Sequence, residues 1–196
     1  PFAGTYPDYT RTARRHDFSL EPPKDTMLDQ IKQAGLTVAA VGKINDIFAG
    51  CGITEFVRTS GNADGIEQTI QYLKKDFEGL CFVNLVDFDM LYGHRNDVEG
   101  YAKALSYFDA KLPEILSNLK EEDILMITAD HGCDPSTPST DHSREYVPLV
   151  IYGQKLQGKN LGTREGFGDI AATILDYFKI PSKICGTSLL PEIDML

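Results

Sequence analysis

The chain has 196 residues, of which 42% are hydrophobic and 24% are charged, a balance typical of one globular domain with its own hydrophobic core. A net charge of −10 argues against a nucleic-acid-binding surface, and no apolar run approaches the roughly 18 residues that a membrane span needs. Four widely spaced cysteines without a C-x-x-C motif favour reduced thiols and a cytoplasmic location.

Predicted helices and strands alternate from residue 25 onward. Residues 25–35 begin with a helix N-cap candidate, carry apolar residues at helical spacing and end at Gly35, which predicts a helix. The β-branched run at 36–44 predicts a buried strand. The same criteria predict strands at 80–89, 123–130 and 147–153, and helices at 62–76, at 97–120 with Pro113 inside, and at 167–179.

The predicted strands are almost continuously apolar, which is typical of strands buried on both faces. Such strands, alternating with helices, predict an α/β protein with a mostly parallel sheet covered by helices on both sides. In sheets of this kind, ligands bind beyond the carboxyl ends of the strands. Functional side chains are therefore expected directly after the strands at 80–89 and 123–130, both of which end in aspartate.

Three of the four histidines lie after predicted strands, each close to an aspartate. Imidazole and carboxylate together suit Zn, Mn or Fe, and neighbouring parallel strands bring such ligands to one edge of the sheet. Five or six ligands exceed the need of one tetrahedral ion, so two ions are expected. The associations are Asp89 with His94, Asp130 with His131, and Asp141 with His142.

Each of these residues also has an ordinary structural interpretation, because a single aspartate often caps a helix and a single histidine often makes a structural hydrogen bond. Asp87 and Asp89 are expected to face the same side of a strand, with Asp89 as the ligand and Asp87 orienting a ligand from behind. Asp134 and Asp141 are expected to be loop or supporting residues. His16, in a basic stretch, is expected to be a structural or surface residue or a substrate contact.

Several motifs in this order resemble those of the phosphopentomutases, which are alkaline-phosphatase-like metalloenzymes. The Asp-His-Gly and Asp-His-x-Arg-Glu patterns alone indicate only the superfamily, whereas the full set is specific to the mutases and covers essentially the whole chain. The motifs are RTARRHDFSLEPP at 11–23, VGKINDIFAGCGI at 41–53, VDFDMLYGHRND at 86–97, and TADHGCDPSTPSTDHSRE at 128–145 followed by VPLVIYG.

The resemblance implies an alkaline-phosphatase-like core, a three-layer α/β/α sandwich, that holds two Mn²⁺ ions, with Zn²⁺ or another divalent ion as an alternative. It implies interconversion of ribose 1-phosphate and ribose 5-phosphate, and of the deoxyribose pair, through a phosphorylated threonine and a sugar bisphosphate activator. By motif, Asp130 and His131 would bind one ion, and Asp89, His94 and His142 the other. Two cations would neutralise the charge of the transferred phosphoryl group.

The chain departs from the family pattern at its start. The family carries a metal-binding aspartate and the phosphorylated threonine near its N-terminus, before a cap domain, and neither has an equivalent here. We expect residues 1–20 to be the exit segment of the cap and residues 21–196 to be the C-terminal part of the core. The nucleophile is expected in an upstream part of the same protein, so no catalytic nucleophile is assigned in this chain and the chain alone is expected to be inactive.

Two cationic side chains are expected to bind the small-molecule sugar phosphate. Arg11 matches a family position that faces the phosphate from the cap, and its planar guanidinium suits bidentate phosphate binding; without the resemblance, a solvated basic patch is an equal interpretation. Lys43 follows a predicted strand, where it would neutralise phosphate or only cap the strand end. Arg144 and Glu145 are expected to form a supporting ion pair.

Two other functions remain open at this point. The chain also fits another enzyme of the same superfamily, such as a cofactor-independent phosphoglycerate mutase, a phosphatase or a phosphodiesterase. It also fits a non-catalytic metal-binding fragment, because the upstream residues have no equivalent here. No nucleic-acid or membrane partner is expected.

Overall fold

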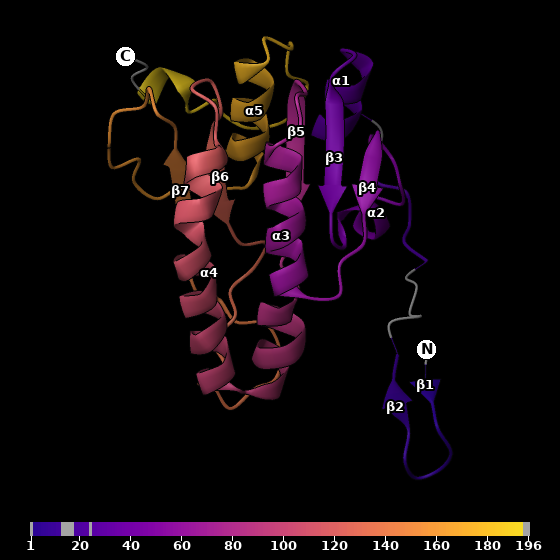
Figure 1. Cartoon of the computed structure of the whole chain (residues 1–196). Helices are drawn as coiled ribbons and strands as arrows, with labels where there is room; N and C mark the ends of the chain where they lie inside the picture. Colours follow the sequence, from indigo (N-terminus) through magenta and orange to yellow (C-terminus); the bar gives the residue numbers. More distant parts are fainter. Residues whose placement is uncertain (1, 13–17, 24, 194–196) are drawn as a thin grey trace.

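The computed structural model describes residues 2–12, 18–23 and 25–193 (Figure 1). At the N-terminal end, strands β1 (Phe2–Ala3) and β2 (Thr10–Arg11) pair antiparallel to form a small hairpin. Figure 1 shows this hairpin apart from the helices and the larger sheet. No helix within the described residues is both long enough and apolar enough to cross a membrane.

The central sheet has three parallel strands in the order β4–β3–β5. Strand β3 (Thr37–Val41) lies in the middle, between β4 (Glu55–Val57) and β5 (Gly79–Val83). Each parallel connection contains a helix, as parallel neighbours require. Helix α2 (Ile44–Ile47) follows β3, and α3 (Asn62–Leu73) leads into β5.

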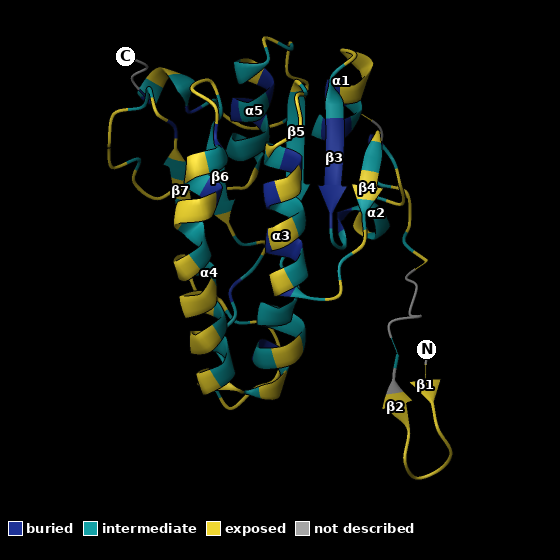
Figure 2. Ribbon diagram, in the orientation of Figure 1, coloured by how far each residue is buried: buried dark blue, intermediate teal, exposed yellow. Residues whose placement is uncertain are grey.

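Helices cover both faces of β3, whose side chains alternate between them. Val38 and Ala40 pack in one cluster with residues of α1 (Met27–Gln33) and α5 (Gly168–Tyr177). Ala39 and Val41 pack on the other face, against Tyr72 of α3. Figure 2 shows β3 as a buried element with helices around it. The predicted α/β/α layering is therefore confirmed.

Helix α1 has a capping box at its start and a left-handed glycine shortly after its end. The Thr26 hydroxyl accepts a hydrogen bond from the Asp29 backbone N–H, and the Thr26 N–H donates to the Asp29 carboxylate, which forms a capping box at the start of α1. Gly35 has a φ of 82°, a left-handed conformation that glycine adopts without steric cost, and it ends the helix where predicted. Helix α4 (Val98–Asn118) also forms as predicted and continues through Pro113.

The last two strands depart from the predicted parallel pattern. Strands β6 (Leu125–Thr128) and β7 (Leu149–Tyr152) pair antiparallel and form a separate sheet. The connection between them, residues 129–148, contains no helix in the described structure, so it supplies no crossover for a parallel pair. The chain instead turns back through a long loop, and this loop carries Asp130, His131 and His142.

The segment after β5 also differs from the prediction, which placed Asp87 and Asp89 on one face of a strand. The strand ends at Val83, and Asp89 lies in a π-helical turn, η1 (Phe88–Tyr92). Asp87 precedes this turn and binds α3: its carboxylate accepts a hydrogen bond from the Asn62 N–H at 2.6 Å, and its own N–H donates to Asn62 Oδ1 at 2.9 Å. This reciprocal contact with another helix explains why the chain stops being extended.

Substitution of Asp87 is expected to destabilise the fold, because it removes the acceptor that caps α3 and ties that helix to the segment leading to Asp89. We expect Asp87→Ala to lower the free energy of unfolding by about 1–2 kcal/mol, measured by urea denaturation, with Asp87→Asn less affected because it keeps an acceptor oxygen. The control is Asp109→Ala, an exposed position on α4. Equal stability of Asp87→Ala and the control would contradict the capping role.

Candidate metal centre

Three imidazole rings surround the carboxylate of Asp89. His94 Nε2 lies 3.2 Å from Asp89 Oδ2, His142 Nε2 lies 3.2 Å from Oδ1, and His131 Nε2 lies 4.0 Å from Oδ1. The ring centroids of His131 and His142 are 3.6 Å apart in a stacked arrangement. The residues come from two separate segments, the turns after β5 and the loop after β6, so the fold alone brings them together.

Hydrogen bonds at the opposite ring nitrogens orient two of the histidines. His94 Nδ1 lies 2.6 Å from the carbonyl oxygen of Thr140, and His131 Nδ1 lies 3.0 Å from that of Gly132. A carbonyl only accepts, so each Nδ1 carries a proton, which leaves Nε2 as the ring nitrogen that can bind a metal ion. Both Nε2 atoms lie close to the carboxylate oxygens of Asp89. A cation among these atoms would be bound by imidazole nitrogens and carboxylate oxygens together.

The carboxylate of Asp89 itself has an unsatisfied atom. Oδ1 is buried and has no hydrogen-bond partner, although His142 Nε2 is close. Buried carboxylate oxygens without a partner are costly, so an unmatched one is suited to binding a cation. Ligand atoms from Asp89, His131 and His142 all lie within 4.8 Å of one another, and no other group of metal-binding side chains converges this way among the described residues. The residues present therefore fit a transition-metal ion.

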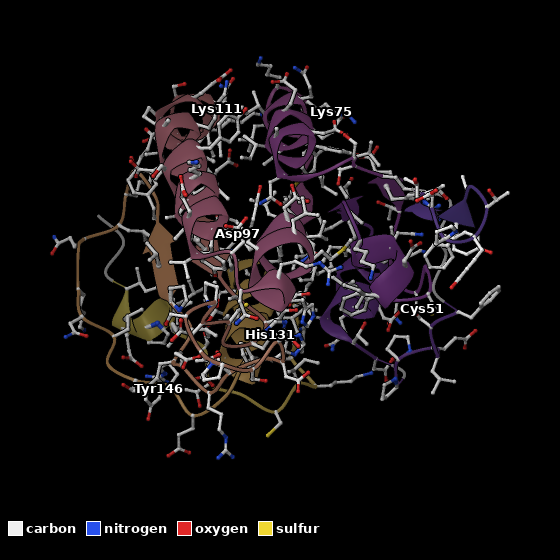
Figure 3. The ribbon with its side chains drawn as sticks, turned by 90° about the horizontal axis from the view of Figure 1, so that it is seen from below. Cys51, Lys75, Asp97, Lys111, His131 and Tyr146 are labelled. Carbon is white, nitrogen blue, oxygen red and sulfur yellow. The ribbon has the colours of Figure 1, made fainter. Side chains whose placement is uncertain are left out.

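Asp130 lies at the rim of this cluster. Its Oδ1 is 3.7 Å from His131 Nε2, and its side chain is 76% exposed, compared with 32% for Asp89. The two ligand sets predicted from the motifs, Asp130 with His131 and Asp89 with His94 and His142, adjoin each other because His131 also approaches Asp89. Figure 3 labels His131 in a view of the molecule from below.

The loop that carries His142 is closed on itself. The Ser143 N–H donates to the Gly132 carbonyl at 3.1 Å, and the Ser143 hydroxyl accepts from the Asp134 N–H at 2.8 Å. The Asp134 carboxylate accepts from both the N–H and the hydroxyl of Ser136, which lowers the pKa of Asp134. Asp134 is thus a loop residue, one of the two roles expected for it, and the closed loop presents His142 beside His131.

Cys133 is a neighbour of the site that sequence reasoning missed. Its sulfur lies so close to the turn before His94 that a Cβ added to Gly93 would be 2.2 Å from it. Burial, and then the charge of Asp89, raise the pKa of the Cys133 thiol, so it stays neutral at pH 7. A single cysteine has no spacing signal, and only the tertiary structure places it against Asp89.

The other predicted residues lie outside this cluster. Lys43 lies two residues after β3, beyond the carboxyl end of the strand, and is the N-cap residue of α2. The side chain of Arg11 and the whole of His16 lie outside the described residues, although the Arg11 backbone forms part of β2. The expected Arg144–Glu145 ion pair is wrong: both side chains are exposed, and no ion pair of the described residues joins them.

Comparison with known proteins gives consistent matches. Residues 9–182 match the sequence profile of the Metalloenzyme superfamily. The phosphopentomutase of Lachnoclostridium phytofermentans is 70% identical over 193 residues, which cover 98% of this chain and 50% of that protein. The phosphopentomutase of Acetivibrio thermocellus is 58% identical over 194 residues, with 98% and 50% covered. The chain thus spans about half the length of these curated relatives.

Two solved structures share the fold at low sequence identity. Phosphoglycerate mutase from Leishmania mexicana superposes with a TM-score of 0.66 at 17% identity, over 86% of this chain and 39% of that one. The PH0037 protein from Pyrococcus horikoshii superposes with a TM-score of 0.56 at 18% identity, over 78% of this chain and 52% of that one. At such identities the likeness establishes the architecture, and the chemistry must be argued from the site.

The close approach at Gly132 predicts that a single methyl group disturbs the site. A Cβ there would lie 2.5 Å from the Ser143 carbonyl oxygen and 2.8 Å from the Glu145 nitrogen, both backbone atoms, so the segment next to His142 must shift. We expect Gly132→Ala to destabilise the chain by about 1–3 kcal/mol and to move the NMR signals of the histidine rings.

The matched control is Gly158→Ala, where an added Cβ meets no heavy atom within 4 Å. Unchanged histidine signals and stability in Gly132→Ala would show that the loop absorbs the methyl group without moving His142.

Proposed function

Because this chain belongs to the Metalloenzyme superfamily, whose members have an alkaline-phosphatase-like fold, we propose that it is the metal-binding part of a phosphopentomutase core. One observation carries the proposal: two imidazoles with protonated Nδ1 atoms place Nε2 beside the carboxylate of Asp89, whose Oδ1 is buried and has no hydrogen-bond partner. The identity to curated phosphopentomutases favours this member of the superfamily over phosphoglycerate mutases, which share the fold at 17% identity.

The family implies divalent metal ions, and the donor set of this chain is consistent with Mn²⁺, with Zn²⁺ as an alternative. In the proposal, Asp89, His94 and His142 hold one ion, while Asp130 and His131 contribute to a second, completed by residues outside this chain. When bound, such ions supply positive charge to the oxygens of a phosphoryl group during in-line transfer.

The protein's own contribution is to hold these ligands in place before any ion or substrate binds. The carbonyl groups of Thr140 and Gly132 fix the rings of His94 and His131 with Nε2 directed inward. Such carbonyl partners set the tautomer and raise the basicity of a ligating imidazole. Lys43, at the same edge of the sheet, adds a positive charge that helps to bind the phosphate group of the substrate.

The proposed substrates are ribose 1-phosphate and ribose 5-phosphate, and the deoxyribose pair, in the reducing cytoplasm. A phosphorylated threonine and a sugar bisphosphate activator are parts of the same proposal, with the threonine upstream in the same protein. Residues 1–20 are proposed as the exit segment of a cap and residues 21–196 as the C-terminal part of the core. This division agrees with the hairpin of β1 and β2, which pairs only within itself among the described strands.

The proposal predicts that the chain binds Mn²⁺ through His142. In calorimetric titration with Mn²⁺, we expect His142→Ala to lower the affinity by roughly 100-fold or more. Residues that only orient a metal ligand typically change metal affinity by about 10–100-fold, and loss of the ligand itself should have a larger effect. The unfolding midpoint of the metal-free chain should change little, because His142 is half exposed. The control is His16→Ala. In the complete protein, His142→Ala should abolish mutase activity.

The substrate class is tested in the complete protein with ribose 5-phosphate, phosphoglycerate and an aryl phosphate as alternatives. Turnover of ribose 5-phosphate alone is the expected result. Near-normal turnover and metal content in His142→Ala would overturn the ligand assignment, and turnover of phosphoglycerate in preference would overturn the substrate.

Arg11 is predicted to bind substrate and not metal. In the complete protein, Arg11→Ala removes a charge-assisted hydrogen bond to phosphate, worth about 1.5–3 kcal/mol, so the KM for ribose 5-phosphate should rise roughly tenfold to hundredfold. Bound Mn²⁺, measured by atomic absorption, should stay the same. Lys103→Ala, which removes an exposed cation on α4, serves as the control. Lost metal at unchanged KM would refute this role.

A further inference from the structure

Asn96 makes an unusual set of contacts beside the proposed metal site. It follows the short 3-10 turn η2 (Gly93–Arg95) and has φ 53° and ψ 33°, a left-handed conformation. Its side-chain nitrogen lies 2.6 Å from the Thr137 carbonyl oxygen, 3.0 Å from that of Ser139 and 3.3 Å from that of Pro135. Three carbonyl oxygens of one loop thus converge on one amide group, whose two N–H bonds are shared among them.

The loop needs such a donor from outside. Two of its residues, Pro135 and Pro138, have no backbone N–H, so the segment cannot form a regular hydrogen-bonded ladder of its own. Within it, the Thr137 N–H donates to the Asp134 carbonyl, and the Thr137 hydroxyl donates to the same oxygen. The carbonyls of Pro135, Thr137 and Ser139 accept from Asn96, and that of Ser139 also lies 3.4 Å from the Thr137 hydroxyl. The Asn96 amide therefore donates to carbonyl oxygens at the tip of the loop.

The same loop and the same turn carry two of the proposed metal ligands. His94 lies two residues before Asn96 and donates to the carbonyl of Thr140, while His142 lies two residues after Thr140. The contacts of His94 and Asn96 with one run of carbonyl groups therefore fix the turn against the loop. Since His94 and His142 each approach Asp89 to 3.2 Å, a shift between turn and loop separates the two rings.

We infer that Asn96 is a positioning residue: it fastens the loop that carries His142 to the turn that carries His94, and so sets the metal affinity of the site. The inference rests on the proposed metal centre. Asparagine combines the two properties required, tolerance of the left-handed backbone and a doubly donating amide. Substitution by aspartate retains the left-handed backbone and the side-chain shape but places a carboxylate near three carbonyl oxygens. Substitution by glycine retains only the left-handed backbone.

The test uses the 196-residue chain with Asn96→Asp and Asn96→Gly. The control is Asn118→Asp, because Asn118 also donates to a backbone carbonyl, that of Glu114, but at the far end of α4. In the metal-free chain, amide hydrogen exchange is measured at Thr137 and Ser143, both hydrogen-bonded within the loop. We expect exchange there to accelerate roughly tenfold or more in both Asn96 variants, with the amides of β3 unchanged, as for a local opening.

A second arm measures metal binding. Mn²⁺ affinity by calorimetry should fall roughly 10–100-fold in both Asn96 variants, the range found for residues that orient metal ligands. The visible absorption of the Co²⁺-loaded chain should change as well, because coordination geometry determines the intensity of those bands. A residue that merely stabilised the fold would leave that spectrum unchanged.

The outcomes separate the inference from the proposed function. Unchanged loop exchange, unchanged Mn²⁺ affinity, or exchange that accelerates equally in β3 would overturn the role of Asn96. If the unaltered chain bound no Mn²⁺ while loop exchange still responded to Asn96, the metal centre and the effect on affinity would be refuted, and the fastening of the loop would stand.

Discussion

The site depends on one electrostatic constraint, the convergence of three imidazole Nε2 atoms on a single carboxylate, that of Asp89. Asp89 Oδ1 is buried without a hydrogen-bond partner, and His94 and His131 are held with Nε2 beside the two oxygens of this carboxylate. The same nitrogens and carboxylate oxygens form a donor set that suits a transition-metal cation. Hydrogen bonds from Nδ1 to backbone carbonyls hold the rings of His94 and His131 in this orientation. The fold therefore positions the nitrogen ligands before a metal ion binds.

The surrounding fold meets this constraint by holding two segments, the turns after β5 and the loop after β6, with hydrogen bonds. Strand β5 is held in a parallel sheet, and the Asp87–Asn62 contact ties the segment after it to α3 before the chain reaches Asp89. The second segment is a loop, closed by the Gly132–Ser143 contact and fastened from outside by Asn96. The segment after β5 is thereby tied to α3, and the loop after β6 is closed on itself and tied to Asn96, so both segments that carry the ligands are held in place.

The antiparallel pairing of β6 and β7 also determines where the loop with His131 and His142 lies. Because no crossover helix connects β6 to β7, the connecting residues 129–148 stay at one end of these two strands. A connection of about 20 residues without helix or strand is unusually long, and loops of this length are often functional. They can therefore place His131 next to the strand end and return His142 beside it, with the two rings stacked at 3.6 Å. In a parallel pair, the chain would have to cross back to the opposite end of the strands before β7 could begin.

The sequence by itself determined the layers of the fold and the identity of the residues at its carboxyl edge. Hydrophobic periodicity and helix caps are local properties, so α1, β3, α3 and α4 were predictable, and aspartates and histidines after strands stood out against a chain with four histidines. Only the tertiary structure decided that Asp89 is central, that Asp87 caps a helix 25 residues earlier, and that Asn96 and Cys133 border the site. Those roles arise from contacts between segments distant in sequence, and an asparagine that binds three carbonyls of a remote loop has the same local pattern as one that binds none.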